Sequence, residues 1–197
     1  MVALFTRAPS IGRVKTRLAR VVGDVTAFEL QRVMLERTLR TLTDSKLDAE
    51  VWIDGDSDTL PPHPFAVRAQ PAGDLGERML AACTHIAARN RTPIVIGSDC
   101  PVLDAGYLHA AAEALARGAD VVTGPVADGG YVLIGMTRPR PELFLHMTWS
   151  VATVHSQTLQ RAEALGLRTV VLRELWDVDD AAGLQRWREL EASNPGR

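Results

Sequence analysis

A basic loop near the start of the chain is the first feature that could carry chemistry. Residues 7–18 read RAPSIGRVKTRL, and the first 23 residues hold five bases and no acid. A loop with proline and glycine that leads into a helix suits a phosphate, because backbone N–H groups and the helix dipole attract an anion there. The loop is not a Walker A motif, since Val14 stands where that motif requires glycine. A solvated amphipathic helix is the alternative interpretation.

The distribution of charge favours a small anionic ligand over a nucleic acid. The formal net charge is −2, yet the chain after residue 23 carries all 24 acids and only 17 of the 22 bases. A nucleic-acid groove usually spreads its bases along one face, whereas here they form a short island. Lysine occurs only twice in the chain, so Lys15 indicates a need for a compact ammonium group in this loop.

An aspartate follows an apolar run in the middle of the chain. Asp99 lies within the pentapeptide GSDCP, directly after the run at 93–97. An acid at the end of a strand is well placed to hold Mg²⁺ or Mn²⁺, hard cations that prefer carboxylate oxygens and bridge to phosphates. A helix cap or an Asx turn before Pro101 is the alternative.

Two later motifs could face a ligand. Asp128 opens the tetrapeptide DGGY, whose glycines allow a ligand to approach the backbone closely. The alternative is a hairpin turn, for which Asp-Gly is an ordinary signal. Trp149 and Ser150 precede a helical segment, and Ser150 could simply be its N-cap.

The last acidic group precedes the final helical segment. Residues 177–180 read DVDD, and acids at a helix N-terminus are favourable without any function. Three acids in four residues nevertheless exceed what a cap needs. We therefore expect Asp177 and Asp179 to complete a metal site with Asp99.

Other chemistries lack the residues they need. The five histidines show no metal-ligand spacing, and Cys83 and Cys100 form neither a zinc pair nor a disulfide framework. No GxGxxG motif supports a dehydrogenase, and Ser98 lacks the GxSxG context of a hydrolase. No apolar run approaches the ~20 residues of a membrane helix. We expect a cytoplasmic protein that binds neither membranes nor nucleic acid.

Short apolar runs alternate with helical patterns along the chain. The runs predict buried parallel strands at 2–6, 50–54, 93–97, 120–124 and 167–172, with 131–136 as a possible antiparallel strand. Helical spacing of apolar residues occurs at 28–42, 75–86, 108–115 and 184–190. This alternation predicts one α/β domain with a mostly parallel, mixed sheet covered on both faces. Ligands bind at the carboxyl ends of such strands, where the polar loops begin.

The order of these motifs resembles that of a known family. The basic loop, GSDCP, DGGY, WS and DVD follow each other as in the small bacterial transferases of the GT-A superfamily, which have the nucleotide-diphospho-sugar transferase fold. Some of these are described as glycosyltransferases of arsenosugar biosynthesis; 2-phospholactate and molybdenum cofactor guanylyltransferases are related. The resemblance covers residues 3–190. It implies a single-domain GT-A, or Rossmann-like, three-layer sandwich at 1–192 and a flexible tail at 193–197.

The resemblance implies a role for each motif. The residues implied to bind the nucleotide are Arg7, Gly12, Lys15, Arg17, Gln70, Gly73, Leu75, Gly76, Arg78 and Ser98. Those implied to hold Mg²⁺ or Mn²⁺ are Asp99, Asp177 and Asp179. Those implied to face the sugar or the acceptor are Gly129, Gly130, Tyr131, Trp149 and Ser150. We expect Lys15 to stabilise charge on the departing phosphate and Asp128 to position or deprotonate the acceptor.

Two reactions fit these roles. The first is transfer of a sugar from an NDP-sugar to a small-molecule acceptor. Many glycosyltransferases of this fold carry Asp-x-Asp in mid-chain, whereas GSDCP has one acid, so nucleotidyl transfer with release of pyrophosphate from an NTP is the alternative. In both reactions a metal neutralises charge on the leaving group. A non-catalytic nucleotide-binding module is a third possibility, which the joint presence of Lys15, Asp99 and Asp179 disfavours.

Overall fold

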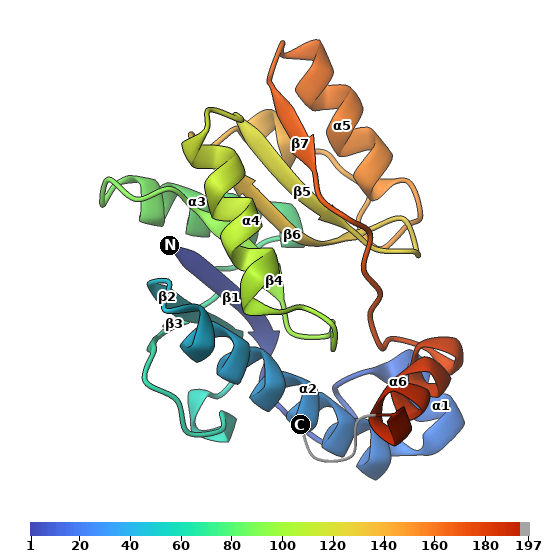
Figure 1. Ribbon diagram of the computed structural model, residues 1–197. Coiled ribbons are helices and arrows are strands. Elements are labelled where there is room, and N and C mark those ends of the chain that lie inside the picture. Colours follow the sequence, from blue (N-terminus) through green and yellow to red (C-terminus); the bar gives the residue numbers. More distant parts are fainter. Residues whose placement is uncertain (194–197) are drawn as a thin grey trace.

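A seven-stranded sheet between two layers of helices forms the computed structural model, which describes residues 1–193 (Figure 1). The strands are β1 Val2–Arg7, β2 Ala49–Asp54, β3 Ala66–Ala69, β4 Ile94–Gly97, β5 Val121–Pro125, β6 Tyr131–Met136 and β7 Thr169–Val171. Their order across the sheet is β3-β2-β1-β4-β6-β5-β7. All neighbouring pairs are parallel except those of β6, which runs antiparallel to β4 and β5. The predicted mostly parallel, mixed sheet is confirmed.

Burial explains which strands the sequence reveals. The central strands are covered on both faces and are apolar along most of their length, as β1 illustrates with five consecutive buried residues, 2–6. The edge strand β3 reads Ala-Val-Arg-Ala and is exposed along most of its length. No apolar run marks β3, so it escapes prediction.

Residues 1–193 form six α-helices, of which five lie between strands and the last follows β7. They are α1 Thr16–Val22, α2 Asp24–Ser45, α3 Leu75–Ala87, α4 Ala105–Ala116, α5 Val154–Ala164 and α6 Ala181–Ser193; η1 Ser57–Thr59 and η2 Pro141–Leu143 are short 3₁₀ turns. The Asp74 carboxylate accepts from Glu77 N at the start of α3, and the Glu77 side chain accepts from Asp74 N. Asp104 is the N-cap of α4, and its side chain accepts from Tyr107 N. The tail predicted at 193–197 lies outside the described residues, apart from Ser193 at the end of α6.

The helices cover the two faces of the sheet in pairs. Apolar residues of α2 and α4 form one core with one face of the strands, and both helices lie in front of the sheet in Figure 1. Residues of α3 and α5 form a second core on the opposite face. A third, smaller core joins α1, α2 and α6 beyond the end of β1, where α1 and α6 lie side by side. The three-layer arrangement follows from this pairing.

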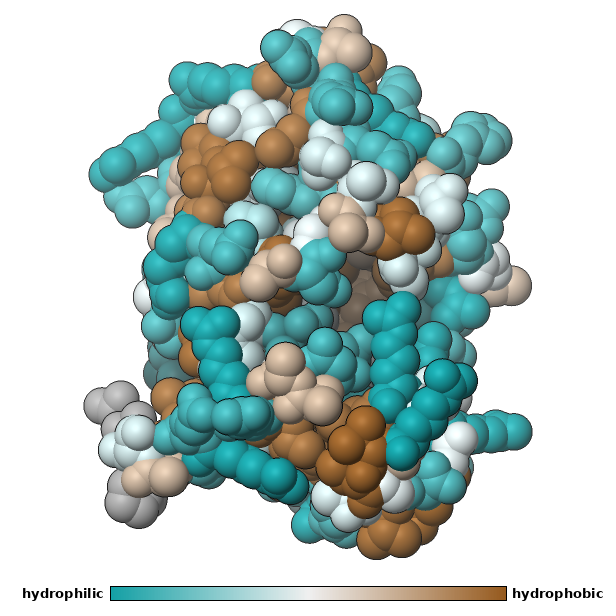
Figure 2. Space-filling model, turned by 90° about the vertical axis from the view of Figure 1, so that its right-hand side faces the viewer, coloured by the Kyte–Doolittle hydropathy of each residue, from teal (hydrophilic) through white to brown (hydrophobic). Residues whose placement is uncertain are grey.

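The sheet has a switch point at its centre. β1 pairs with β2 on one side and with β4 on the other, so the connections that leave the carboxyl ends of β1 and β4 diverge and leave a crevice. The side of the molecule towards which β1 runs is hollowed near its middle, as Figure 2 shows. None of the helices in residues 1–193 is long and apolar enough to span a membrane.

Candidate functional site

Four aspartates from separate parts of the chain face one another at the carboxyl ends of the strands. Asp99 follows β4, Asp128 follows β5, and Asp177 and Asp179 lie in the segment before α6. Val178 N donates to Asp99 O over 3.0 Å, which fixes the two segments together. The charges of these carboxylates act on one another, as the pKa values of two of them show.

Burial and mutual repulsion raise the pKa of both late aspartates. The pKa of Asp177 rises to about 6, first because the side chain is buried and then because of the charges of Asp128, Asp179 and Asp99. Burial and the Asp99 charge also raise the pKa of Asp179, against the opposing charges of Lys15 and Arg17. Burial and the neighbouring carboxylates thus disfavour the charged forms of both side chains.

Lys15 enters this cluster and is almost completely enclosed. Its Nζ lies 2.9 Å from Asp99 Oδ1 and 3.8 Å from Asp179 Oδ1, and it donates to Val178 O over 2.7 Å. The side chain is only 2% exposed. The backbone of Lys15 is left-handed, with φ 46° and ψ 47°, a conformation that costs energy for a residue with a Cβ. The fold holds this strained residue in place because Val14 and Leu18 beside it are buried.

The other predicted phosphate-binding residues of the loop lie at the surface. Arg7 is exposed at the end of β1, and Arg17 is exposed in the first turn of α1, where its charge reaches Asp179. Gly12 is exposed with φ 76°, which requires a residue without a Cβ at this turn. The predicted loop thus supplies one buried cation to the carboxylates and leaves its arginines facing solvent.

The donor set has the chemistry of a site for a divalent cation, although Lys15 occupies part of it. Carboxylate oxygens are the ligands that Mg²⁺ and Mn²⁺ prefer, and two negative charges remain when the four aspartates are set against Lys15 and Arg17. Within residues 1–193, however, no three acidic, histidine or cysteine side chains are arranged around one point as metal ligands. The ammonium of Lys15 stands between Asp99 and Asp179 instead.

A buried polar network beneath Asp99 is not predicted from the sequence. Gln31 and Thr38 lie on the buried face of α2; Gln31 Nε2 donates to Ser98 Oγ over 3.4 Å, and Thr38 Oγ1 donates to Ser98 O over 3.4 Å. Ser98 Oγ in turn donates to Thr6 Oγ1. Ser98 was predicted to bind the nucleotide. In the structure its side chain is buried and forms hydrogen bonds within the protein. The presence of Gln31 and Thr38 within the apolar stripe of α2 was the one feature of the sequence that could have predicted this network.

A second group of predicted residues lies at the ends of β1 and β2. Gln70 Nε2 donates to Thr6 O over 3.1 Å and to Trp52 O over 2.9 Å, so its amide group ties the two strands together. Arg78 donates to Asp54 Oδ2 and to Gly73 O, each over 2.9 Å. The structure therefore brings Gln70, Gly73 and Arg78 together, and Asp54 joins them without having been predicted.

Gly76 permits a close contact between α3 and the segment before α5. A Cβ at Gly76 would lie 2.4 Å from Phe144 O and 2.7 Å from Trp149 Cζ2. Trp149 also packs edge-on against Tyr131, with ring centroids 6.5 Å apart. Gly76 is buried in this contact, while Leu75 before it is largely exposed. The predicted nucleotide and acceptor regions are thereby adjacent.

The DGG loop is both a hairpin turn and part of the acidic cluster. It joins β5 to β6, and Asp128 Oδ1 accepts from Gly130 N over 2.9 Å. A Cβ at Gly129, where φ is 88°, would lie 2.0 Å from Ala152 O, so the loop rests directly on the segment before α5. Ser150 lies in that segment, exposed and with φ 62°. It is not the N-cap of α5, which begins four residues later at Val154.

Helix capping was the alternative interpretation for Asp99 and for the acids at 177–180, and in the structure Asp104 and Asp180 cap the helices. Asp104 caps α4, and Asp180 Oδ1 accepts from Gly183 N over 2.8 Å in the first turn of α6. The helices α4 and α6 that follow Asp99 and Asp179 thus have caps that do not use either of these two side chains.

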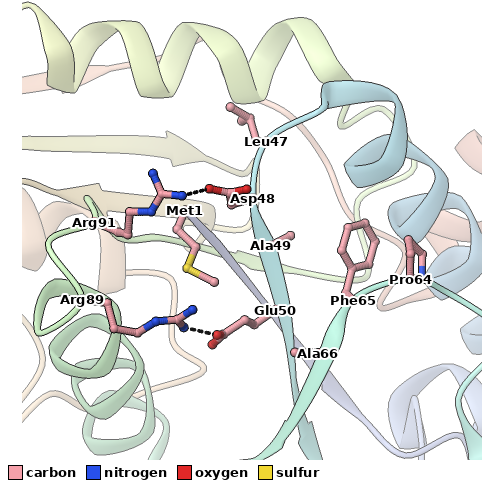
Figure 3. Close-up of a pocket in the computed structure, with 10 residues that line it drawn as sticks. All are labelled: Met1, Leu47, Asp48, Ala49, Glu50, Pro64, Phe65, Ala66, Arg89 and Arg91. Carbon is pink, nitrogen blue, oxygen red and sulfur yellow. Dashed lines mark hydrogen bonds and ion pairs between the residues drawn. The ribbon is translucent and has the colours of Figure 1, made fainter.

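A cavity lies at the opposite end of the sheet, at the amino ends of the strands (Figure 3). Its volume is about 400 Å³, and Phe65 and Met1 form part of its lining. Its charged groups pair with one another: Arg89 with the buried Glu50, and Arg91 with Asp48. This pairing marks the cavity as a structural ion-pair cluster.

Comparison with known proteins places the chain in a family. Residues 35–151 match the family described as "Uncharacterized protein conserved in bacteria (DUF2064)". The match spans more than half of the chain, which belongs to this family. None of the curated proteins matches the sequence significantly.

Solved structures of known proteins share the fold. A protein from Desulfovibrio desulfuricans G20, provisionally named a nucleotide-diphospho-sugar transferase, is 30% identical with a TM-score of 0.85; the match covers 98% of this chain and 88% of that one. A cytidylyltransferase from Leptospira borgpetersenii serovar Hardjo-bovis is 16% identical, with a TM-score of 0.61 and coverage of 98% and 86%. Rv0371c from Mycobacterium tuberculosis H37Rv, in complex with manganese, is 14% identical, with a TM-score of 0.60 and coverage of 95% and 97%. The last two are similar in fold alone.

Proposed function

We propose that the protein is a metal-dependent transferase that takes a sugar from an NDP-sugar and attaches it to a small-molecule acceptor. One observation carries this proposal: carboxylates with uncompensated charge and a buried lysine meet at the carboxyl ends of the strands. The fold is shared with a relative that bears a nucleotide-diphospho-sugar transferase name at 30% identity. Rv0371c, which shares the fold at 14% identity, is described as a complex with manganese.

Each part of the site has a role in this reaction. The bond between the anomeric carbon and the diphosphate oxygen breaks, the acceptor oxygen bonds to that carbon, and the nucleoside diphosphate leaves. Lys15, Arg17 and Arg7 bind the diphosphate and stabilise its charge. Asp99, Asp177 and Asp179 would hold Mg²⁺ or Mn²⁺, a cation that would neutralise charge on the phosphate oxygens. Asp128 orients the acceptor hydroxyl and takes its proton.

The remaining predicted residues would shape the two ends of the site. The group around Gln70, Gly73 and Arg78 would contact the base and ribose, with the first turn of α3 beside it. The segment carrying Trp149 and Ser150 would border the acceptor with the DGGY loop. Their adjacency, through the contact of Gly76 with Trp149, supports a single continuous site.

Nucleotidyl transfer is a second candidate, favoured by a specific observation. One acid follows β4, and a cytidylyltransferase shares the fold over 98% of this chain. In that reaction the acceptor oxygen attacks the α-phosphorus of an NTP, the bond from the α-phosphorus to the bridging oxygen breaks, and pyrophosphate leaves. The same lysine and carboxylates would stabilise the departing pyrophosphate.

Analysis of the products released from labelled donors distinguishes the two reactions. The protein is incubated with Mn²⁺, a pooled set of acceptors and either NDP-sugars or NTPs. Release of a nucleoside diphosphate from an NDP-sugar supports glycosyl transfer, and pyrophosphate from an NTP supports the second candidate. Asp99→Asn should abolish either release, while Asp104→Asn, which keeps a good helix cap, should leave it intact. Release that survives Asp99→Asn would contradict the assignment of this site.

A further inference from the structure

The Lys15 ammonium stands where a cation shared by Asp99 and Asp179 would bind. Its Nζ contacts Asp99 Oδ1 at 2.9 Å and Val178 O at 2.7 Å, and Asp179 Oδ1 is 3.8 Å away. The side chain is 98% buried, so these groups, rather than water, surround its charge. A charge buried in this way must be paired, and the carboxylates provide that pairing.

A divalent cation would compete with Lys15 for the same carboxylates. Mg²⁺ binds carboxylate oxygens at about 2.0–2.1 Å. A cation at that distance from Asp99 Oδ1 would meet an ammonium that already contacts the same oxygen at 2.9 Å. The two cations would repel each other and compete for the charge of the same carboxylates, so the resident ammonium weakens cation binding in this geometry.

We propose that Lys15 is the resident counter-ion of the carboxylate cluster and that a divalent cation enters only when nucleotide phosphates draw the ammonium away from Asp99. This inference rests on the proposed function, because it assumes that phosphates and a cation bind here. Lysine suits the exchange, since its ammonium is a point charge on a flexible four-carbon stem. Lys15 stands at the end of the basic loop, at the N-cap of α1, with a left-handed backbone.

The exchange makes cation and nucleotide binding interdependent. Phosphates that take up Lys15 free the carboxylates, so nucleotide must raise the affinity for the cation, and the cation must raise the affinity for nucleotide by the same factor. In the absence of nucleotide, the cation competes with Lys15 and binds weakly. Removal of the ammonium should therefore strengthen cation binding to the free protein.

Mn²⁺ binding without nucleotide, followed by electron paramagnetic resonance of the free ion, tests this directly. We expect Lys15→Met to bind Mn²⁺ at least tenfold more tightly than the parent protein. Lys46→Met is the matched control, because Lys46 is the other lysine, is exposed and also has a left-handed backbone (φ 57°); it should bind as the parent does. Asp99→Asn in the Lys15→Met background should abolish the gain.

The other outcomes separate the two proposals. Equal Mn²⁺ affinity of the parent and Lys15→Met, with loss in Asp99→Asn, would leave the metal site standing and overturn the exchange. Absence of Mn²⁺ binding in every variant would overturn the exchange and the metal dependence in the proposed function together.

NMR of the lysine ammonium groups in the parent protein provides a second test, which does not depend on whether Lys15→Met folds. With two lysines in the chain, ¹⁵Nζ labelling gives two ammonium signals, and the enclosed Lys15 exchanges its protons more slowly than exposed Lys46. Mg²⁺ alone should leave the Lys15 signal in place. Mg²⁺ with GDP or CDP, whichever stabilises the protein thermally, should shift it. An unchanged Lys15 signal in the stabilised complex would overturn the exchange.

Discussion

Replacing Gly76 by alanine tests how the two halves of the site are held together. Gly76 is the second residue of α3, where a change from glycine to alanine ordinarily improves helix stability by up to about 1 kcal/mol. Here the added Cβ would lie 2.4 Å from Phe144 O, about 1 Å closer than an ordinary contact, and 2.7 Å from the ring of Trp149. Phe144 is fully buried, so its carbonyl group cannot move aside freely.

The steric term should exceed the helix term. Overpacking costs about 1–3 kcal/mol, which leaves a net loss of up to about 2 kcal/mol after a gain of about 1 kcal/mol in helix propensity. For a chain of this size the melting temperature should fall by up to about 8 °C. Urea unfolding followed by circular dichroism gives the free energy, and tryptophan fluorescence reports any displacement of Trp149.

Gly106→Ala provides a matched control. Gly106 is also the second residue of an aspartate-capped helix, α4, but its added Cβ would meet only Asp104 Oδ1, at 3.3 Å. Its stability should equal that of the parent protein or exceed it by up to about 1 kcal/mol. If Gly76→Ala were as stable as Gly106→Ala, the packing of α3 against residues 144–149 would be refuted.

Two further substitutions test a buried ion pair at the amino ends of the strands and an arginine that hydrogen-bonds the segment before α5. Burial alone would raise the pKa of Glu50, but hydrogen bonds and charges from Arg68 and Arg89 outweigh it and hold the pKa below the ordinary 4.5. The stability that the ionised Glu50 contributes is therefore complete above pH 4.5 and is lost as the pH falls through the lower folded-state pKa. Glu50→Gln should lower the free energy of unfolding by about 1–3 kcal/mol at pH 7 and should weaken the loss of stability at acid pH. An unchanged loss of stability at acid pH would speak against this ion pair. Arg161 donates to the carbonyl groups of residues 142, 145 and 146 over 2.7–2.9 Å. Arg161→Met should therefore lower the free energy of unfolding in urea by about 1–2 kcal/mol and alter the fluorescence of Trp149. Values equal to those of the parent protein in both measurements would exclude this anchoring role.

The fold was largely predictable because its strands are buried on both faces. Five apolar runs mark β1, β2, β4, β5 and β7, and the glycine pair before Tyr131 marks the antiparallel β6. Edge exposure removes this signal from β3. The start of α5 was misplaced for a different reason: Ser150 has the residue type of a cap but adopts a left-handed backbone outside the helix.

The composition of the site was predictable, but its pairing was not. Strand ends converge in a parallel sheet, so acids that follow different strands can be expected to meet. Lys15 contacts Asp99 across 84 positions and Val178 across 163, and no local pattern specifies such partners. The family resemblance likewise implied that Gly76 binds the nucleotide, whereas the close neighbours of Gly76 in the structure are residues 144 and 149.

The central claim is that the carboxylate cluster takes a nucleotide-activated donor with a divalent cation. Thermal unfolding of the parent protein and of Asp99→Asn, with a panel of NDP-sugars and NTPs and with or without Mn²⁺, tests it most directly. A donor at 100 times its Kd adds about 2.7 kcal/mol, which corresponds to a rise of about 5–10 °C. We predict such a rise for at least one donor, only with Mn²⁺ and only in the parent protein. No rise with any donor, or an equal rise in Asp99→Asn, would contradict the claim.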